Sequence, residues 1–200
     1  MSEPSLPPEP LHPDDLAFPE EPITVFRATS RGITARFARP EAAIIRELVG
    51  QVVELVAADL PATGADDLAA MVGISDSAEV PDDPVLARLL PDGYRNDPDA
   101  ALEFRRFTES GLRSAKVESA QLLLQTLPAG GGRVRLSADE AEAWLRSLND
   151  VRLAMGVRLG VTEDFEQLIE DLEPDDARYG YAHIYDWLSL LQASLVEALS

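Results

Sequence analysis

Cysteine is absent from this 200-residue chain, and that absence excludes several kinds of chemistry. The chain has no disulfide, no thiolate nucleophile, no thiol redox switch and no cysteine-ligated zinc or iron–sulfur centre. Histidine is almost as scarce, with only His12 and His183, so a histidine-based metal site lacks ligands. The sequence therefore predicts a protein with no metal and no cofactor.

Long apolar runs are also missing. No stretch of about 18 apolar residues occurs, which argues against a membrane-spanning helix. The first residues show no basic segment followed by an apolar one, the pattern of a secretory signal. We therefore expect a cytoplasmic protein with no membrane contact.

Catalytic constellations are hard to find. His183, Asp186 and Ser189 are spaced three apart on one predicted helix, so they share a face. A catalytic triad needs its members to converge from different directions, which one helix face seldom allows. The many carboxylates gather in loops and at helix ends, where solubility and the helix dipole explain them. The sequence therefore predicts that this chain is not an enzyme.

The first 22 residues differ in composition from the rest. They hold seven of the 15 prolines and six carboxylates, with no lysine or arginine. Such a segment cannot bury enough apolar surface to offset the entropy cost of ordering it. We predict a disordered, acidic, proline-rich tail at 1–22 and a single globular α+β regulatory domain at 23–200.

Alternating β-branched and polar residues predict a small antiparallel sheet. Its members are a hairpin of strands 23–28 and 32–38, turning at Gly32, and one late strand, 133–136, after a glycine-rich loop. The loop lacks any phosphate-binding glycine pattern, so a helix end and a flexible connection explain it best.

Apolar residues spaced three and four apart predict helices over most of the remaining chain. Asp97-Pro98 and the capping box from Ser137 to Glu140 mark two helix starts. Short helices are expected at 66–72 and 85–90. The four long helices are predicted at 40–58, 98–127, 137–160 and 179–199. The predicted fold is α+β and predominantly helical, with the sheet packed on a bundle of these four helices.

The few positive charges are the most informative feature of the composition. The formal net charge is -19, from 36 acids and 17 bases, and Lys116 is the only lysine. Four bases fall on one side of the predicted helix 98–127. They are Arg105, Arg106, Arg113 and Lys116. A basic face on an acidic protein favours docking of an acidic partner over a catalytic pocket. A simply solvated face is the alternative.

Two further features leave alternatives open. Arg27, Arg31, Arg36 and Arg39 lie in the predicted hairpin region, where no acid occurs between 23 and 40. They are either the solvated face of a small sheet, which we favour, or a contact for an anion such as DNA. The strongly negative net charge opposes non-specific DNA binding.

One arginine of the helix 137–160 should be half-buried. Arg152 projects close to the apolar side of that helix, so it needs a polar partner. It is either part of a structural ion pair or, together with Tyr185, part of a small-molecule site between helices. Of these two interpretations we favour the structural ion pair.

Three segments resemble a known family. They are Tyr94-Arg95-Asn96-Asp97-Pro98 with residues 103–108, the run 143–154 with 158–161, and Tyr185-Asp186-Trp187-Leu188. Together they are similar to an actinobacterial family described as a domain of unknown function. That family is typically encoded beside the ClpS protease adaptor and includes an oxidative-stress transcriptional regulator. The resemblance covers about residues 23–199.

The resemblance implies a non-enzymatic regulatory or adaptor protein that acts through protein–protein contacts. It points to a sigma factor, RNA polymerase or the Clp machinery as partner. It also implies that the protein contacts DNA only indirectly, and it leaves open whether the protein forms a homodimer. Redox sensing in that family is tied to cysteine, so thiol switching cannot extend to this chain. The alternatives are a direct DNA-binding transcriptional regulator and a small-molecule-binding protein.

Overall fold

The computed structural model describes residues 24–58, 81–94, 96–162 and 178–200, with positions 165, 172, 173, 175 and 176. The predicted tail at 1–22 and the predicted helix at 66–72 lie outside these residues. In chain order the elements are β1 (Arg27–Thr29), β2 (Gly32–Phe37), α1 (Arg39–Ala57), α3 (Pro84–Leu89), α4 (Pro98–Thr126), β3 (Gly132–Leu136), α5 (Ala138–Leu159) and α7 (Tyr179–Leu199). The predicted α+β, mainly helical fold is confirmed.

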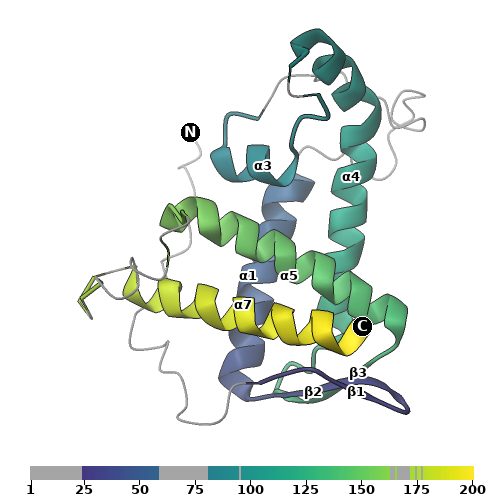
Figure 1. Ribbon diagram of the computed structural model, residues 1–200, viewed down its shortest axis with the longest axis vertical. Helices are drawn as coiled ribbons and strands as arrows, with labels where there is room; N and C mark the ends of the chain where they lie inside the picture. The colour runs from purple at the N-terminus through teal and green to yellow at the C-terminus, as the bar shows by residue number, and fades with distance from the viewer. Residues whose placement is uncertain are drawn as a thin grey trace, which may run out of the picture.

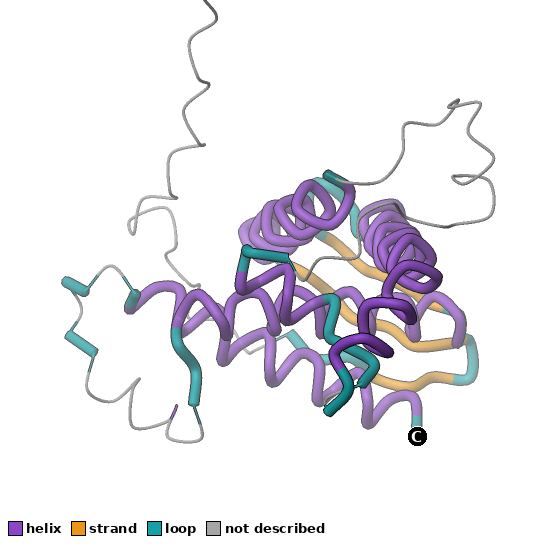
Figure 2. Tube along the Cα trace, turned by 90° about the horizontal axis from the view of Figure 1, so that it is seen from above, coloured by secondary structure: helices purple, strands orange, loops and turns teal. Residues whose placement is uncertain are grey.

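The helices form two crossed pairs, and the sheet closes one end of them. Helices α5 and α7 lie side by side and run in opposite directions, and α1 and α4 run roughly crosswise to them (Figure 1). The strands lie beyond the lower end of α1 and α4, on the far side in the view from above (Figure 2). One face of the sheet therefore packs on helices, and none of the described helices covers the other face.

The sheet is a three-stranded antiparallel arrangement in the order β1-β2-β3. The hairpin and the late strand are thus joined as predicted, although almost a hundred residues separate β2 from β3. At the turn, Gly32 has a φ of 110°, and a Cβ there would lie 2.5 Å from the carbonyl oxygen of Leu136. Only glycine fits this position without displacing β3.

The first strand begins later than the predicted 23–28. The backbone N–H of Phe26 donates to Ser194 Oγ of α7 at 3.0 Å. The hydroxyl of Thr24 lies 2.8 Å from Glu41 Oε2 in α1. The same hydroxyl lies 2.9 Å from the Arg36 carbonyl oxygen of β2. The Phe26 N–H, however, is bonded to α7 and not to β2, which explains the shorter strand.

Alternate residues of β2 and β3 build the core beneath the sheet. Their inward side chains are Ile33, Ala35, Phe37, Val134 and Leu136, all buried. The indole of the fully buried Trp144 stacks on Phe37 and meets Phe26 edge-on, with ring centroids 5.6 Å and 5.5 Å apart. Aromatic packing of this kind fixes α5 against the inner face of the sheet.

Both predicted helix starts are confirmed. Ser137 Oγ accepts from the Glu140 N–H at 3.2 Å, and Glu140 Oε2 accepts from the Ser137 N–H at 2.7 Å. Asp97 Oδ1 accepts from the Ala100 N–H at 3.1 Å. Each cap satisfies an N–H that the helix itself leaves unpaired, so each fixes where its helix begins.

Candidate functional site

The predicted basic face of α4 is wrong as a description of the surface. Arg105 is 5% exposed and Arg113 is 3% exposed, so both are core residues. Lys116 is mostly buried and donates to Asp150 Oδ1 at 2.6 Å. Of the four cations, only Arg106 lies exposed.

Helix ends explain why the two arginines turn inward. Arg105 Nη2 donates to the Leu90 carbonyl at 3.0 Å, at the end of α3. Arg113 Nη1 donates to the Val56 carbonyl at 2.8 Å, in the last turn of α1. The last carbonyls of a helix have no partner within it and carry the negative end of its dipole, so a guanidinium is a favourable cap.

A single carboxylate bridges both buried arginines. Glu109 accepts from Arg105 Nη1 at 2.6 Å and from Arg113 Nη2 at 2.8 Å. Asp92 also accepts from Arg105, at 2.7 Å. Burial lowers the pKa of Arg105, but hydrogen bonds to Asp92 and Glu109 outweigh it and raise that pKa overall. This network therefore joins α1, α3 and α4 and has no free charge to offer a partner.

Lys116 and Asp150 make a second internal pair, between α4 and α5. Asp150 is 4% exposed. Burial raises the pKa of the Asp150 carboxyl, and the hydrogen bond from Lys116 opposes that rise. Removing either partner would leave the other charge in a poorly solvated place.

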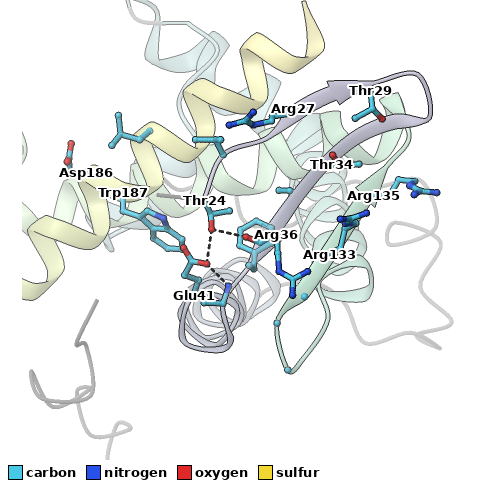
Figure 3. A pocket seen from close by; sticks show the side chains of 18 of the residues that line it. Thr24, Arg27, Thr29, Thr34, Arg36, Glu41, Arg133, Arg135, Asp186 and Trp187 are labelled. Atoms are coloured by element: carbon cyan, nitrogen blue, oxygen red, sulfur yellow. Dashed lines mark hydrogen bonds between the residues drawn. The ribbon is translucent and has the colours of Figure 1, made fainter. Parts of the chain in front are cut away.

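The outer face of the sheet gathers the arginines that do face solvent. Side chains alternate along a strand, and the inward positions of β2 and β3 are apolar. The outward positions carry Arg27, Thr34, Arg36, Arg133 and Arg135, which we call the arginine face (Figure 3). The four arginines are exposed. Among the described residues, no carboxylate lies within ion-pair distance of any of them.

The register arranges the arginine face in two rows across the strands. Arg27, Thr34 and Arg135 form one row, and Arg36 and Arg133 form the next. The rows are two residues apart along the strands, which is about 6.8 Å. Arg36 and Arg133 are directly opposite each other, and like charges in such cross-strand positions repel. The folded chain thus holds a local concentration of positive charge.

This face is the floor of an open groove of about 1390 Å³. The glycine-rich loop and the hairpin turn with Arg31 form its margins. Helix α7 forms a wall with side chains that are more aromatic and apolar than those of the floor. These wall residues are Tyr179, His183, Asp186, Trp187 and Leu190.

The glycine-rich loop shapes the margin of the groove. Gly131 has a φ of 74°, and a Cβ there would lie 2.8 Å from both the Phe37 carbonyl oxygen and the Arg39 nitrogen. The loop can therefore press against the junction between β2 and α1 only because this residue is glycine. The loop connects α4 to β3 as predicted, but through a close backbone contact instead of the flexible connection expected.

Two acids line the groove, and one of them is already engaged. Glu41 is 8% exposed, and its Oε2 accepts from the Ala38 N–H at 2.6 Å, at the start of α1. The Thr24 hydroxyl contacts the same oxygen (Figure 3). The negative charge of Glu41 is balanced by the positive amino end of the α1 dipole. Asp186 is the exposed acid of the wall, so arginines outnumber free carboxylates in the groove.

Arg152 and Tyr185 do meet, but with structural partners. Arg152 Nε donates to Ser189 Oγ at 2.9 Å and its Nη1 donates to Gln192 Oε1 at 2.7 Å. The guanidinium also lies 5.3 Å from the centroid of the Tyr185 ring. Within the described residues these partners are neutral, so the structure shows polar and cation–π contacts between α5 and α7 instead of the expected ion pair.

The histidine, aspartate and serine of α7 do not form a triad. Ser189 Oγ donates to the Tyr185 carbonyl at 2.8 Å and accepts from Arg152. The ring of His183 packs on Tyr179, with centroids 4.4 Å apart. The described part of the chain also holds no group of three or more histidines and acids placed to bind a metal. None of its helices is long and apolar enough to cross a bilayer.

The sequence indicated half of the arginine face. Arg27 and Arg36 were recognised as a basic hairpin, whereas Arg133 and Arg135 were placed in a late strand with no role. The usable signal was their alternation with Val134 and Leu136, which turns both arginines to one face. What joins the two pairs is the β2–β3 register, a contact between distant parts of the chain.

Sequence comparison identifies the family to which the chain belongs. The model of a family described as "Domain of unknown function (DUF2017)" matches residues 23–199, and the chain belongs to this family. Its relatives include the "Oxidative stress regulator AosR" of Mycobacterium tuberculosis and of Mycobacterium bovis. Each is 35% identical over 173 residues, which span 80% of this chain and 78% of the relative.

The "Putative oxidative stress regulator AosR" of Mycobacterium leprae shows the same identity over the same length. No solved structure matches the chain significantly. The resemblance to a family that includes an oxidative-stress regulator is thereby confirmed. The expected position beside ClpS in the genome stays a prediction.

Proposed function

We propose that this protein is a non-enzymatic regulator of oxidative-stress transcription that acts by binding another protein through the arginine face. The names of the mycobacterial relatives support the regulatory role. The observation that carries the binding role is the cluster of exposed arginines without described carboxylate partners on one side of the sheet. The expected partners are a sigma factor, RNA polymerase or the Clp machinery.

The chemistry of the groove suits recognition. Arginine stays protonated at all physiological pH values, so it binds anions but does not exchange protons. The ring of His183, which also lines the groove, packs on Tyr179. Charge complementarity of this kind contributes specificity and association rate more than affinity, which suits a reversible regulator.

Direct DNA binding is the second candidate function. Arginine and threonine, the residue types of the outer face, are both common contacts to phosphate oxygens. Against this, a chain with a net charge of -19 repels a polyanion at longer range. A protein partner therefore comes first, and a gel-shift assay on promoter duplexes at about 50 mM salt tests the DNA alternative.

Complementation in cells tests the proposal. A deletion strain receives the wild-type gene or the groove set Arg36→Glu, Arg133→Glu and Arg135→Glu. A matched set, Arg88→Glu, Arg106→Glu and Arg146→Glu, changes the charge equally at exposed positions outside the groove. We expect the groove set to lose induction of stress transcripts by peroxide, at equal protein levels, and the matched set to retain it.

Two results would overturn the assignment. Full complementation by the groove set would remove the arginine face from the function. Failure of the matched set alone would place docking on other exposed arginines, including Arg106 of the originally predicted face.

A further inference from the structure

We infer that the partner presents an extended acidic segment, with carboxylates at every second residue, to the two arginine rows. This inference rests on the proposed function, because it names the chemistry of the partner at the same site. It goes further by specifying the conformation and the spacing of the charges that the groove accepts.

The spacing of the rows carries the first step. Rows two residues apart along β2 and β3 are separated by about 6.8 Å. In an extended peptide, side chains at positions i and i+2 point to the same side and repeat at the same interval. A segment lying along the strands can therefore place one carboxylate over the row of Arg27 and Arg135 and the next over the row of Arg36 and Arg133.

Repulsion within the second row carries the next step. Arg36 and Arg133 are cross-strand partners, and their charges are not neutralised by any described carboxylate. A carboxylate between two guanidiniums replaces that repulsion with charge-assisted hydrogen bonds. The electrostatic energy of Arg36 and Arg133 is thus less favourable in the free protein than in the complex. This difference is the electrostatic basis for binding.

The wall of the groove favours a peptide over nucleic acid. Leu190 is 44% exposed on the α7 wall of the groove, three residues after Trp187. Apolar side chains of a peptide can bury against this wall, whereas a sugar–phosphate backbone cannot. Among the described strand residues, the outward positions carry no aromatic side chain on which single-stranded bases could stack.

Two peptides of equal composition test the spacing. In one, glutamate alternates with serine; in the other, the same glutamates are contiguous and the serines follow. Both carry a fluorophore and are titrated with the full-length protein, with anisotropy as the readout. We expect the alternating peptide to bind about tenfold more tightly, the equivalent of one additional charge-assisted hydrogen bond.

Matched variants test the site. Arg36→Gln with Arg133→Gln should abolish the preference for the alternating peptide. Arg88→Gln with Arg146→Gln, outside the groove, should leave the preference intact. Equal melting temperatures of these variants and the wild type establish that folding is unchanged.

Several results would overturn the inference. Equal affinity for the two peptides would show that the groove responds to the net charge of a peptide and not to the spacing of its carboxylates. Binding of neither peptide, or tighter binding of a duplex of about 20 base pairs that depends on Arg36 and Arg133, would each reject an extended acidic segment. The proposed function is judged separately: loss of complementation by the groove set would uphold it even if both peptides fail.

Discussion

Two basic regions of this molecule, the α4 helix and the arginine face, use the same side chain in opposite ways. On α4, Arg105 and Arg113 point inward and bind main-chain carbonyls and Glu109. On the sheet, Arg36 and Arg133 point outward, side by side, with no described acid to neutralise them. In a strongly acidic chain, an unpaired cluster of cations is the less expected of the two arrangements.

The difference teaches where to look for a docking surface. A buried guanidinium must have its donors and its charge satisfied, because desolvation without partners costs several kcal/mol. Such a residue is committed to the fold and cannot serve a second partner. An exposed guanidinium stays hydrated, so the absence of an ion-pair partner costs it little free energy. Substitutions in the α4 network should therefore lower the free energy of unfolding more than substitutions on the arginine face.

The largest effect is expected at Glu109. Glu109→Gln leaves Arg105 and Arg113 buried with less compensation for their charge, so we expect a loss of about 3–5 kcal/mol in unfolding free energy. Guanidinium denaturation followed by circular dichroism measures it. The control Glu142→Gln removes the exposed partner of Arg146 and should cost less than about 1 kcal/mol. Similar small losses in both variants would contradict the structural role of the network.

A somewhat smaller effect is expected at the pair between α4 and α5. Lys116→Met leaves the Asp150 carboxylate buried without its partner, for which we expect a loss of about 2–4 kcal/mol at pH 7. The double variant Lys116→Met, Asp150→Leu should recover most of this loss. Independent, additive effects in that double-mutant cycle would argue against a coupled pair.

The same variant predicts a pH dependence of definite sign. Burial raises the pKa of Asp150 in the folded state, and removing Lys116 raises it further. The folded state then binds a proton more tightly than the unfolded state, so the penalty is fully present above the folded pKa. It fades as the pH falls toward about 3.9, the unfolded value. A deficit in Lys116→Met that grows on acidification would refute this reading.

The smallest effect is expected on the arginine face. Arg36→Thr and Arg133→Thr each relieve the cross-strand repulsion, and we expect an interaction energy between them of about 0.2–1 kcal/mol in a double-mutant cycle. Thermal unfolding at low salt measures it, and added salt should reduce it by screening. A loss of more than about 2 kcal/mol in either single variant would mean that these arginines support the fold, as those of α4 do.

Most of the fold could be predicted because its signals are local. The capping box at Ser137 and the cap at Asp97 fixed two helix starts within a residue. The strands followed from alternation around Gly32 and Val134. The shortened first strand could not be foreseen, since the Phe26 N–H is bonded to Ser194 at the other end of the chain.

The candidate site was less accessible to sequence reasoning. A helical projection places Arg105 and Arg113 on a polar sector, and charged residues are usually exposed, so the expected surface was reasonable but wrong. The carbonyls of Leu90 and Val56 that draw them inward come from other helices. The arginine face was divided between distant segments, which only the pairing of β2 with β3 unites.

That pairing also makes the arginine face a property of the completed tertiary structure. The β1–β2 hairpin brings together neighbours in sequence. The second row exists only after β3, which follows the described helices α1, α3 and α4 in the chain, has paired with β2. A ligand that contacts both rows consequently binds the folded protein and not the unfolded chain. By mass action, such a ligand would stabilise the folded protein against unfolding to an extent set by its concentration.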